Sequence, residues 1–193
     1  MESDGRTEGE VISLSDADAT ACVLDPAMGL ALIRDVIARS MARNQRQPKS
    51  AALLAISIDN MRPITELFGQ MVVEPLFISL TGHLRGSLRG SDVIARLGED
   101  QLAVVLPYFR FNGAAIAVKR VLGIRSKPVT THYGAVDLKI SVAAVSFPDD
   151  NLTPSDVITR AQAALAYNQT RKNDPLALTD TVRERLKSLR KAS

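Results

Sequence analysis

The sequence is short of several features, and each shortage excludes a class of protein. A single cysteine, Cys22, among 193 residues excludes an internal disulfide. No apolar run approaches the roughly 18 residues of a membrane-spanning helix, and the acidic start is unlike a signal peptide. The net charge of +3, from 24 basic and 21 acidic residues, is too small to indicate nucleic-acid binding. We therefore expect a cytoplasmic protein with no membrane span and no nucleic-acid partner.

What is present suits one globular domain with charged ends. Hydrophobic residues make up 46% of the chain, enough for a core in 193 residues. Acidic side chains dominate the first 25 residues, and basic ones dominate the last 15. We expect residues 1–24 to be an acidic, disordered tail, residues 25–175 to be the domain, and residues 176–193 to be a basic tail or helix.

Apolar patterning predicts helices that alternate with strands. The expected helices are 26–44, 61–68, one ending near residue 89, 113–124, one after Thr153 and a closing basic helix. The expected strands are 50–58, two flanking the tip at residues 98–101, and a pair within 131–147. Thr153 suits the N-cap of its helix, followed by Pro154 and Asp156. This order indicates an α/β domain with a mixed central sheet and helices packed around it.

Four leucines mark one face of the helix that ends near residue 89. Leu76, Leu80, Leu84 and Leu88 recur at every fourth residue, so a helix places them on one side. We interpret this stripe as core, not as a binding groove.

Four stretches, in order, carry a resemblance to a known family. They are "DPAMGL" from residue 25, "SIDNMRPITELFGQMVVEPLF" from residue 57, "RGSDVIARLGEDQLAVVLP" from residue 89 and "AQAALAYNQTRKN" from residue 161. Together they are similar to the GGDEF family of bacterial diguanylate cyclases, which join two GTP molecules into cyclic di-GMP. The resemblance implies a GGDEF-type fold, related to the nucleotide cyclase palm.

The departures from the family pattern fall on the catalytic positions. The resemblance implies that metal and reaction-centre carboxylates belong where this chain has Ser57, Asp100 and Gln101. Ser57 is neutral and a poor metal ligand, and Gln101 neither carries a full negative charge nor takes up a proton at neutral pH. The sequence predicts that no catalytic residue of this set survives except Asp100, and no magnesium or other cofactor is expected.

The positions that the family uses for nucleotide have also changed. The resemblance places guanine-binding residues at Thr65 and Glu74, a histidine at Gln70, a glycine at Val73 and a phosphate-binding lysine at Gln169. A branched Val73 where the family keeps glycine narrows the space for a nucleotide.

The sequence offers two ways in which a metal site could persist. Asp59 follows Ser57 by two residues, so on a strand it shares a face with Ser57 and could bind a metal together with Asp100, with Glu99 approaching from the tip. The alternative is that these are solvated acids at strand ends. His83 and His132 are isolated in sequence and are expected to be surface or satisfied histidines.

One functional motif is retained. The resemblance implies that R-x-x-D before the hairpin is a product-binding inhibitory site, and Arg89 and Asp92 occupy both positions. An arginine fork can donate to guanine O6 and N7, and Asp92 can accept from a guanine N–H. Arg96, Arg120 or Arg125 would support the ligand. The alternative is a structural contact between Arg89 and Asp92.

Three functions remain open from the sequence. The first is a catalytically inactive GGDEF domain that binds cyclic di-GMP through Arg89 and Asp92, with Arg96 and Arg120 as further ligand-binding residues. The second is a protein-interaction module without nucleotide, and the third is a weak cyclase. The expected partners are cyclic di-GMP and a protein, with a homodimer left open.

Overall fold

A computed structural model describes most of the chain. It covers residues 22–23, 25–44, 50–109, 113–124, 128–131, 134–147, 152–170 and 177–178. The expected closing basic helix and most of the two tails lie outside the described residues.

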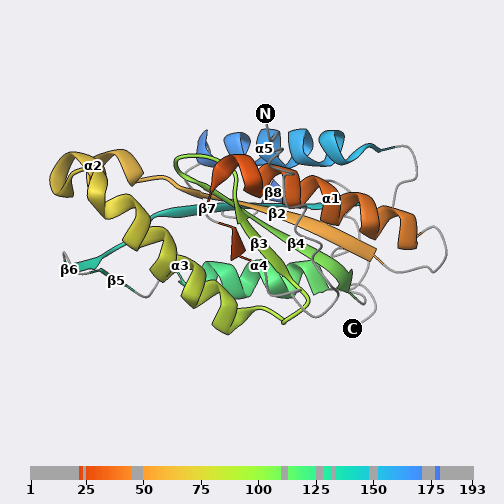
Figure 1. The fold of residues 1–193 in the computed structure, drawn as a ribbon, viewed down its shortest axis with the longest axis horizontal. Helices are drawn as coiled ribbons and strands as arrows, with labels where there is room; N and C mark the ends of the chain where they lie inside the picture. Colours follow the sequence, from red (N-terminus) through yellow and green to blue (C-terminus); the bar gives the residue numbers. More distant parts are fainter. Residues whose placement is uncertain are drawn as a thin grey trace, which may run out of the picture.

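A six-stranded mixed sheet forms the centre of the fold (Figure 1). Its strand order is β1-β3-β4-β2-β7-β8, in which β1 runs parallel to β3, β8 runs parallel to β7, and the other neighbours are antiparallel. The strands are β1 (Cys22–Val23), β2 (Ser50–Ile58), β3 (Val93–Arg96), β4 (Gln101–Phe109), β7 (Ile140–Ser146) and β8 (Ala177–Leu178). The mixed sheet expected from the sequence is confirmed.

Helices cover both faces of the sheet, which explains why β2 is apolar along its whole length. Alternate β2 residues such as Leu54 and Ile56 pack in the layer of α3 and α4, and their neighbours Leu53 and Ala55 pack in the layer of α1 and α5. Figure 1 shows these two layers above and below the strands. The helices are α1 (Pro26–Asn44), α2 (Met61–Phe68), α3 (Val73–Ser87), α4 (Gly113–Gly123) and α5 (Pro154–Thr170), with a 3₁₀ turn at Gln70–Val72.

The cap expected for the last of these helices is present. The Asp156 amide donates to the Thr153 hydroxyl at 3.2 Å, and Asp156 Oδ2 accepts from the Thr153 hydroxyl at 2.6 Å and from the Thr153 amide at 2.8 Å. The two hydrogen bonds to the carboxylate, the one from the hydroxyl first, lower the pKa of Asp156 below its usual value. A reciprocal cap therefore starts α5 where the sequence placed it.

The sheet includes Cys22–Val23 and Ala177–Leu178, just outside the expected bounds of 25 and 175, and those bounds stay a prediction from the sequence. Two other sequence expectations need correction. The expected strand pair within residues 131–147 is instead split: β6 (Gly134–Val136) pairs with β5 (Val129–Thr131), whereas β7 joins the main sheet. Leu88 lies beyond the end of α3 and is only partly buried, so the leucine stripe is core at its first three positions alone.

Gly29 sets how closely α1 approaches the sheet. A Cβ atom built on Gly29 would lie 2.1 Å from the Arg96 carbonyl oxygen of β3. Only glycine permits this approach, because no real Cβ contact is that short.

Within the described residues no single helix is long and apolar enough to cross a bilayer, and one pair, Met61–Phe68 with Gln70–Ser87, meets the length and composition criteria only when joined across a 117° bend.

Candidate functional site

Two groups of polar residues lie at opposite ends of β3. At its end, the hairpin tip meets the last residues of β2: Ser57 pairs with Gln101, and the Ile58 amide donates to the Asp100 carbonyl at 2.9 Å. At its start, Arg89 and Asp92 form the turn that leads from α3 into the strand. The fold therefore separates the expected catalytic positions from the expected ligand-binding positions.

A side-chain network links the catalytic positions Ser57 and Asp59 to α5. Gln169 Nε2 lies 2.8 Å from Ser57 Oγ and 3.1 Å from Asp59 Oδ1. The Ser141 hydroxyl donates to Asp59 Oδ2 at 2.7 Å. Ser57 and Asp59 therefore do lie on one side, as their spacing predicts, but both carboxylate oxygens of Asp59 accept from neutral donors.

This edge does not fit a magnesium ion. An ion at Asp59 would have to displace the hydrogen bonds from Gln169 and Ser141, and Ser57 offers only a buried hydroxyl. In the part of the chain that the structure describes, no three His, Cys, Asp or Glu residues gather as a metal cluster. The sequence named Asp59 and Asp100 only as the less favoured alternative to solvated acids, and the absence of a metal there stays a prediction.

Arg96 lies at the hairpin tip and not with Arg89 and Asp92. Its Nε donates to the Gly98 carbonyl at 2.7 Å, Nη1 reaches Glu74 Oε2 at 3.4 Å, and its guanidinium stacks on the Phe77 ring at 4.1 Å. The Arg96 side chain is only 11% exposed. The structure therefore assigns Arg96 to holding the tip against α3, and the expected ligand contact from Arg96 is not supported by its position.

The remaining nucleotide positions serve local structure. The Thr65 hydroxyl donates to the Arg62 carbonyl within α2 at 2.9 Å, and Val73 opens α3 and packs against the core. Gln70 is exposed in the 3₁₀ turn, and Glu74 pairs with Arg96.

The turn at residues 89–92 is held by the backbone of Arg89. The Arg89 amide donates to Asp92 Oδ2 at 2.9 Å, and the Asp92 amide donates back to the Arg89 carbonyl at 3.0 Å. Ser91 Oγ lies 3.5 Å from Asp92 Oδ1. The structural contact weighed in the sequence is thus present, but it uses the main chain and leaves the guanidinium of Arg89 exposed.

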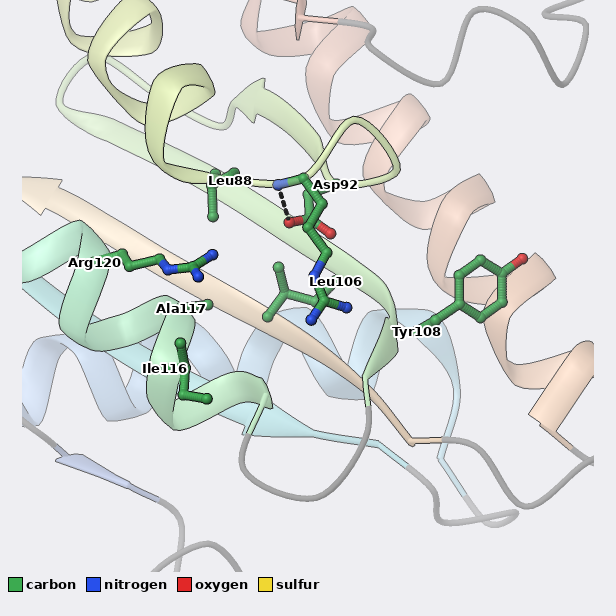
Figure 2. Close-up of a pocket in the computed structure, with 8 residues that line it drawn as sticks. Leu88, Asp92, Leu106, Tyr108, Ile116, Ala117 and Arg120 are labelled. Atoms are coloured by element: carbon green, nitrogen blue, oxygen red, sulfur yellow. Dashed lines mark hydrogen bonds between the residues drawn. The ribbon is translucent and has the colours of Figure 1, made fainter.

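The exposed guanidinium borders a groove, which we call the arginine groove. It is lined by Leu88, Arg89, Asp92, Leu106, Tyr108, Ile116, Ala117 and Arg120, and its cavity volume is about 80 Å³. Figure 2 shows Arg120 extending from α4 toward the space between Leu88 and Leu106, while Tyr108 lies on the α1 side. Leu88, expected to be core, is therefore a groove residue.

Three charged groups meet in the arginine groove. Arg89 and Arg120 are exposed, and Arg120 Nη1 reaches the Ser87 carbonyl at 3.4 Å. Asp92 is 7% exposed, and its burial raises the pKa of the carboxyl above the usual value, against the opposing hydrogen bond and charge of Arg89. Two cations beside one buried carboxylate give a donor-rich, net positive groove with an apolar floor.

His83, the histidine that the structure describes, belongs to no metal cluster among the described residues. His83 is partly buried on α3, and its Nδ1 has no hydrogen-bond partner within the described residues, so the expectation of a satisfied histidine does not hold for that atom. His132 and Arg125 lie outside the described residues.

Arg120, which the sequence named as a ligand-binding residue, lines the groove, whereas sequence reasoning missed the groove's floor and the role of Gln169. Ile116 and Ala117 share a helical face with Arg120, so the sequence carried a signal for them. Gln169 contacts residues more than 100 positions away, and the residues next to it in sequence do not predict that contact.

Comparisons with known proteins agree with this geometry. The family model described as Diguanylate cyclase, GGDEF domain, matches residues 30–175. The bifunctional diguanylate cyclase/cyclic di-GMP phosphodiesterase MucR of Pseudomonas aeruginosa is 22% identical over 136 residues, which cover 70% of this chain and 20% of MucR. The chain spans about a fifth to a third of the length of such curated relatives.

Solved structures show the same fold. The GGDEF domain of TpbB from Pseudomonas aeruginosa superimposes with a TM-score of 0.71 at 21% identity, covering 77% of this chain and 93% of that domain. A structure described as an interaction between a microbial GGDEF domain and cyclic di-GMP has a TM-score of 0.61 at 19% identity, covering 79% and 92%.

Proposed function

The chain belongs to the GGDEF family of diguanylate cyclase domains, and from that premise we propose that it is a catalytically inactive member that binds cyclic di-GMP as an effector module. The observation that carries the proposal is the arginine groove, where Arg89, Asp92 and Arg120 face one space. At the other end of β3, the family's catalytic positions Ser57 and Asp59 are hydrogen-bonded to the neutral side chains of Gln169 and Ser141.

The groove offers what a guanine base and a phosphate require. A guanidinium fork donates two parallel hydrogen bonds to guanine O6 and N7, and a carboxylate accepts from a guanine N–H. Arg89 and Asp92 supply these groups, and Arg120 adds a second cation for phosphate. Leu106, Ile116 and Ala117 give an apolar surface on which a base can lie.

The hairpin tip supports the inactive half of the proposal. Joining the 3′-hydroxyl of one GTP to the α-phosphate of another needs metal to neutralise charge and orient the attacking oxygen. Ser57 is buried and hydrogen-bonded to Gln169, and Asp59 is bonded to Gln169 and Ser141. Each lost metal or electrostatic contact costs on the order of several kcal/mol in the transition state.

Binding tests this proposal directly. We expect isothermal titration to show cyclic di-GMP binding to the full chain, and Arg120→Ala or Arg89→Ala to weaken it roughly tenfold to a hundredfold, about 1 to 3 kcal/mol. Arg89→Lys keeps the charge but loses the planar fork, so a marked loss there indicates guanine recognition.

Arg34→Ala is the matched control, because it removes an exposed arginine from α1 on the other face of the sheet. The Arg34→Ala variant should bind cyclic di-GMP with the affinity of the wild type. Absence of binding well above micromolar ligand would overturn the proposal.

An interaction module without nucleotide is the second candidate. Leu67 and Met71, on α2 and the following 3₁₀ turn, are 76% and 77% exposed. Large apolar side chains exposed on neighbouring elements are typical of protein-docking surfaces. Two results together would favour this function. The wild type would bind no cyclic di-GMP, and the Leu67→Ser and Met71→Ser variants would lose a protein partner that the wild type binds.

A further inference from the structure

We propose that a second cavity, at the ends of α3 and α4, binds the second guanine of a cyclic di-GMP molecule whose first guanine lies in the arginine groove. The inference rests on the proposed function, because it adds a second subsite to the same binding site. We call this cavity the glycine pocket. It is lined by Gly86, Ser87, Leu88, Arg120, Gly123 and Ile124.

The arginine groove alone is small for the proposed ligand. Its cavity volume is about 80 Å³. Sites for small organic molecules typically enclose on the order of 300 to 1,000 Å³. Cyclic di-GMP carries two guanines on a ring of riboses and phosphates, so a groove of this size leaves half of the ligand to be placed elsewhere. The glycine pocket has a volume of about 450 Å³, which brings the combined space into the range of a ligand site.

The two cavities meet at Leu88 and Arg120, which line both of them. Figure 2 shows Leu88 at the end of α3 and Arg120 on α4 on opposite sides of this junction. Arg120 Nη1 reaches the Ser87 carbonyl at 3.4 Å, so the guanidinium lies against the end of α3. A guanidinium has several N–H donors, so Arg120 can donate to Ser87 and to a phosphate together. We therefore expect the phosphates that join the two guanines to lie beside Arg120.

The lining of the glycine pocket suits the edge of a guanine. α3 ends at Ser87 and α4 ends at Gly123, and the last carbonyl groups of a helix have no partner within that helix. Both helix ends also carry partial negative charge, which repels a phosphate and attracts N–H donors. Guanine presents N1–H and N2–H donors to such carbonyls. Leu88 and Ile124 add apolar surface for the faces of the base.

Two glycines keep the pocket open. A Cβ atom built on Gly86 or Gly123 would meet nothing within 4 Å outside its own stretch of helix. Larger side chains at these two positions would therefore fill the pocket without striking the core. Gly82 has equally open surroundings on the same helix but does not line the pocket, so it provides a matched control.

The first test fills the pocket in the full chain. Because the two guanines are joined, the second one binds at roughly millimolar effective concentration, so G86L/G123L should weaken cyclic di-GMP binding roughly tenfold or more. GMP has one guanine and uses the arginine groove alone, so it should bind the variant and the wild type equally. Isothermal titration measures both ligands.

The control for this test is G82L, which should bind cyclic di-GMP with the affinity of the wild type. Leucine is a better helix former than glycine, so thermal unfolding should find G86L/G123L at least as stable as the wild type. A loss of affinity in that variant then reports the filled pocket and not a damaged fold.

The second test uses the wild type without substitution. In amide NMR titrations, the signals of Gly86 and Gly123 should shift with cyclic di-GMP but not with GMP. The signal of Asp92, in the arginine groove, should shift with both ligands.

The outcomes separate this inference from the proposed function. If G86L/G123L binds cyclic di-GMP as tightly as the wild type does, the inference is overturned and the proposed function stands. Gly86 and Gly123 signals that stay unmoved while Asp92 shifts would have the same meaning. A wild type that binds no cyclic di-GMP would overturn the proposed function and the inference with it.

Discussion

Single residues decide how the two ends of β3 differ. Gln169 stands where the family's pattern has a lysine, and its amide joins Ser57 to Asp59. Asp92 is a buried carboxyl whose partners are the Arg89 amide and the Ser91 hydroxyl. Gln169 donates neutral amide hydrogen bonds to the expected catalytic positions, and Asp92 provides a hydrogen-bond acceptor in the groove.

Asp92 makes the stability of the fold depend on pH in an unusual direction. Burial raises the pKa of Asp92 above 3.8, so the native state is penalised at neutral pH and the penalty disappears as pH falls through the raised pKa. Relative to Asp92→Asn, the wild type should therefore gain free energy of unfolding as pH falls from 7 toward 3.8. Denaturant unfolding of both proteins across this range measures it. If the wild type instead loses free energy of unfolding relative to Asp92→Asn as pH falls, hydrogen bonding to the Asp92 carboxylate outweighs its burial.

Restoring acids at the hairpin tip should not restore catalysis. With GTP and magnesium, the wild type should form no cyclic di-GMP above a control without protein, and Ser57→Asp with Gln101→Glu should not recover full activity. Thr65, Val73 and Gln169 remain altered in that variant. Chromatography of the reaction mixtures detects the product. Product formed by the wild type and lost in Asp100→Ala would contradict the inactive assignment.

At the scale of elements, the sequence predicted where helices and strands lie better than it predicted which of them contact one another. Helices α1, α2 and α5 and strand β2 lie where their apolar patterns and caps placed them, because those signals are local. The pairing of β1 with β3 joins Cys22 to Ile94, which are distant in sequence, and the sequence did not indicate it. The β5–β6 pair is a local hairpin in which Thr131 lies opposite Gly134, and the sequence placed only part of it within residues 131–147. The turn at 89–92 lay within a recognised motif, but the groove required α4 to be placed beside it.

The packing of α1 on β3 depends on one glycine. Gly29→Ala places a Cβ 2.1 Å from the Arg96 carbonyl and should lower stability by about 1 to 3 kcal/mol, despite alanine's higher helix propensity. Gly82→Ala, in α3 with nothing within 4 Å, should raise stability by about 0.5 to 1 kcal/mol. Thermal unfolding of both variants measures the contrast. Equal melting temperatures would mean that α1 can move away from β3 at no cost.

At the scale of the molecule, the sheet separates the expected catalytic positions from the arginine groove. Ser57, Asp59, Asp100 and Gln101 meet where β2 ends and the hairpin turns, whereas Arg89, Asp92 and Arg120 meet where β3 begins. The fold thus keeps the residues at the family's catalytic positions away from the arginine groove. The proposed loss of catalysis and the proposed ligand binding therefore concern different parts of this domain.

Amide NMR of the full chain titrated with cyclic di-GMP shows which end of β3 receives the ligand. We expect shifts at Ser91, Asp92, Ala117 and Arg120, around the arginine groove, and none at Asp59, Asp100 or Gln101. Shifts confined to the hairpin tip and the end of β2, with the groove amides unmoved, would contradict it.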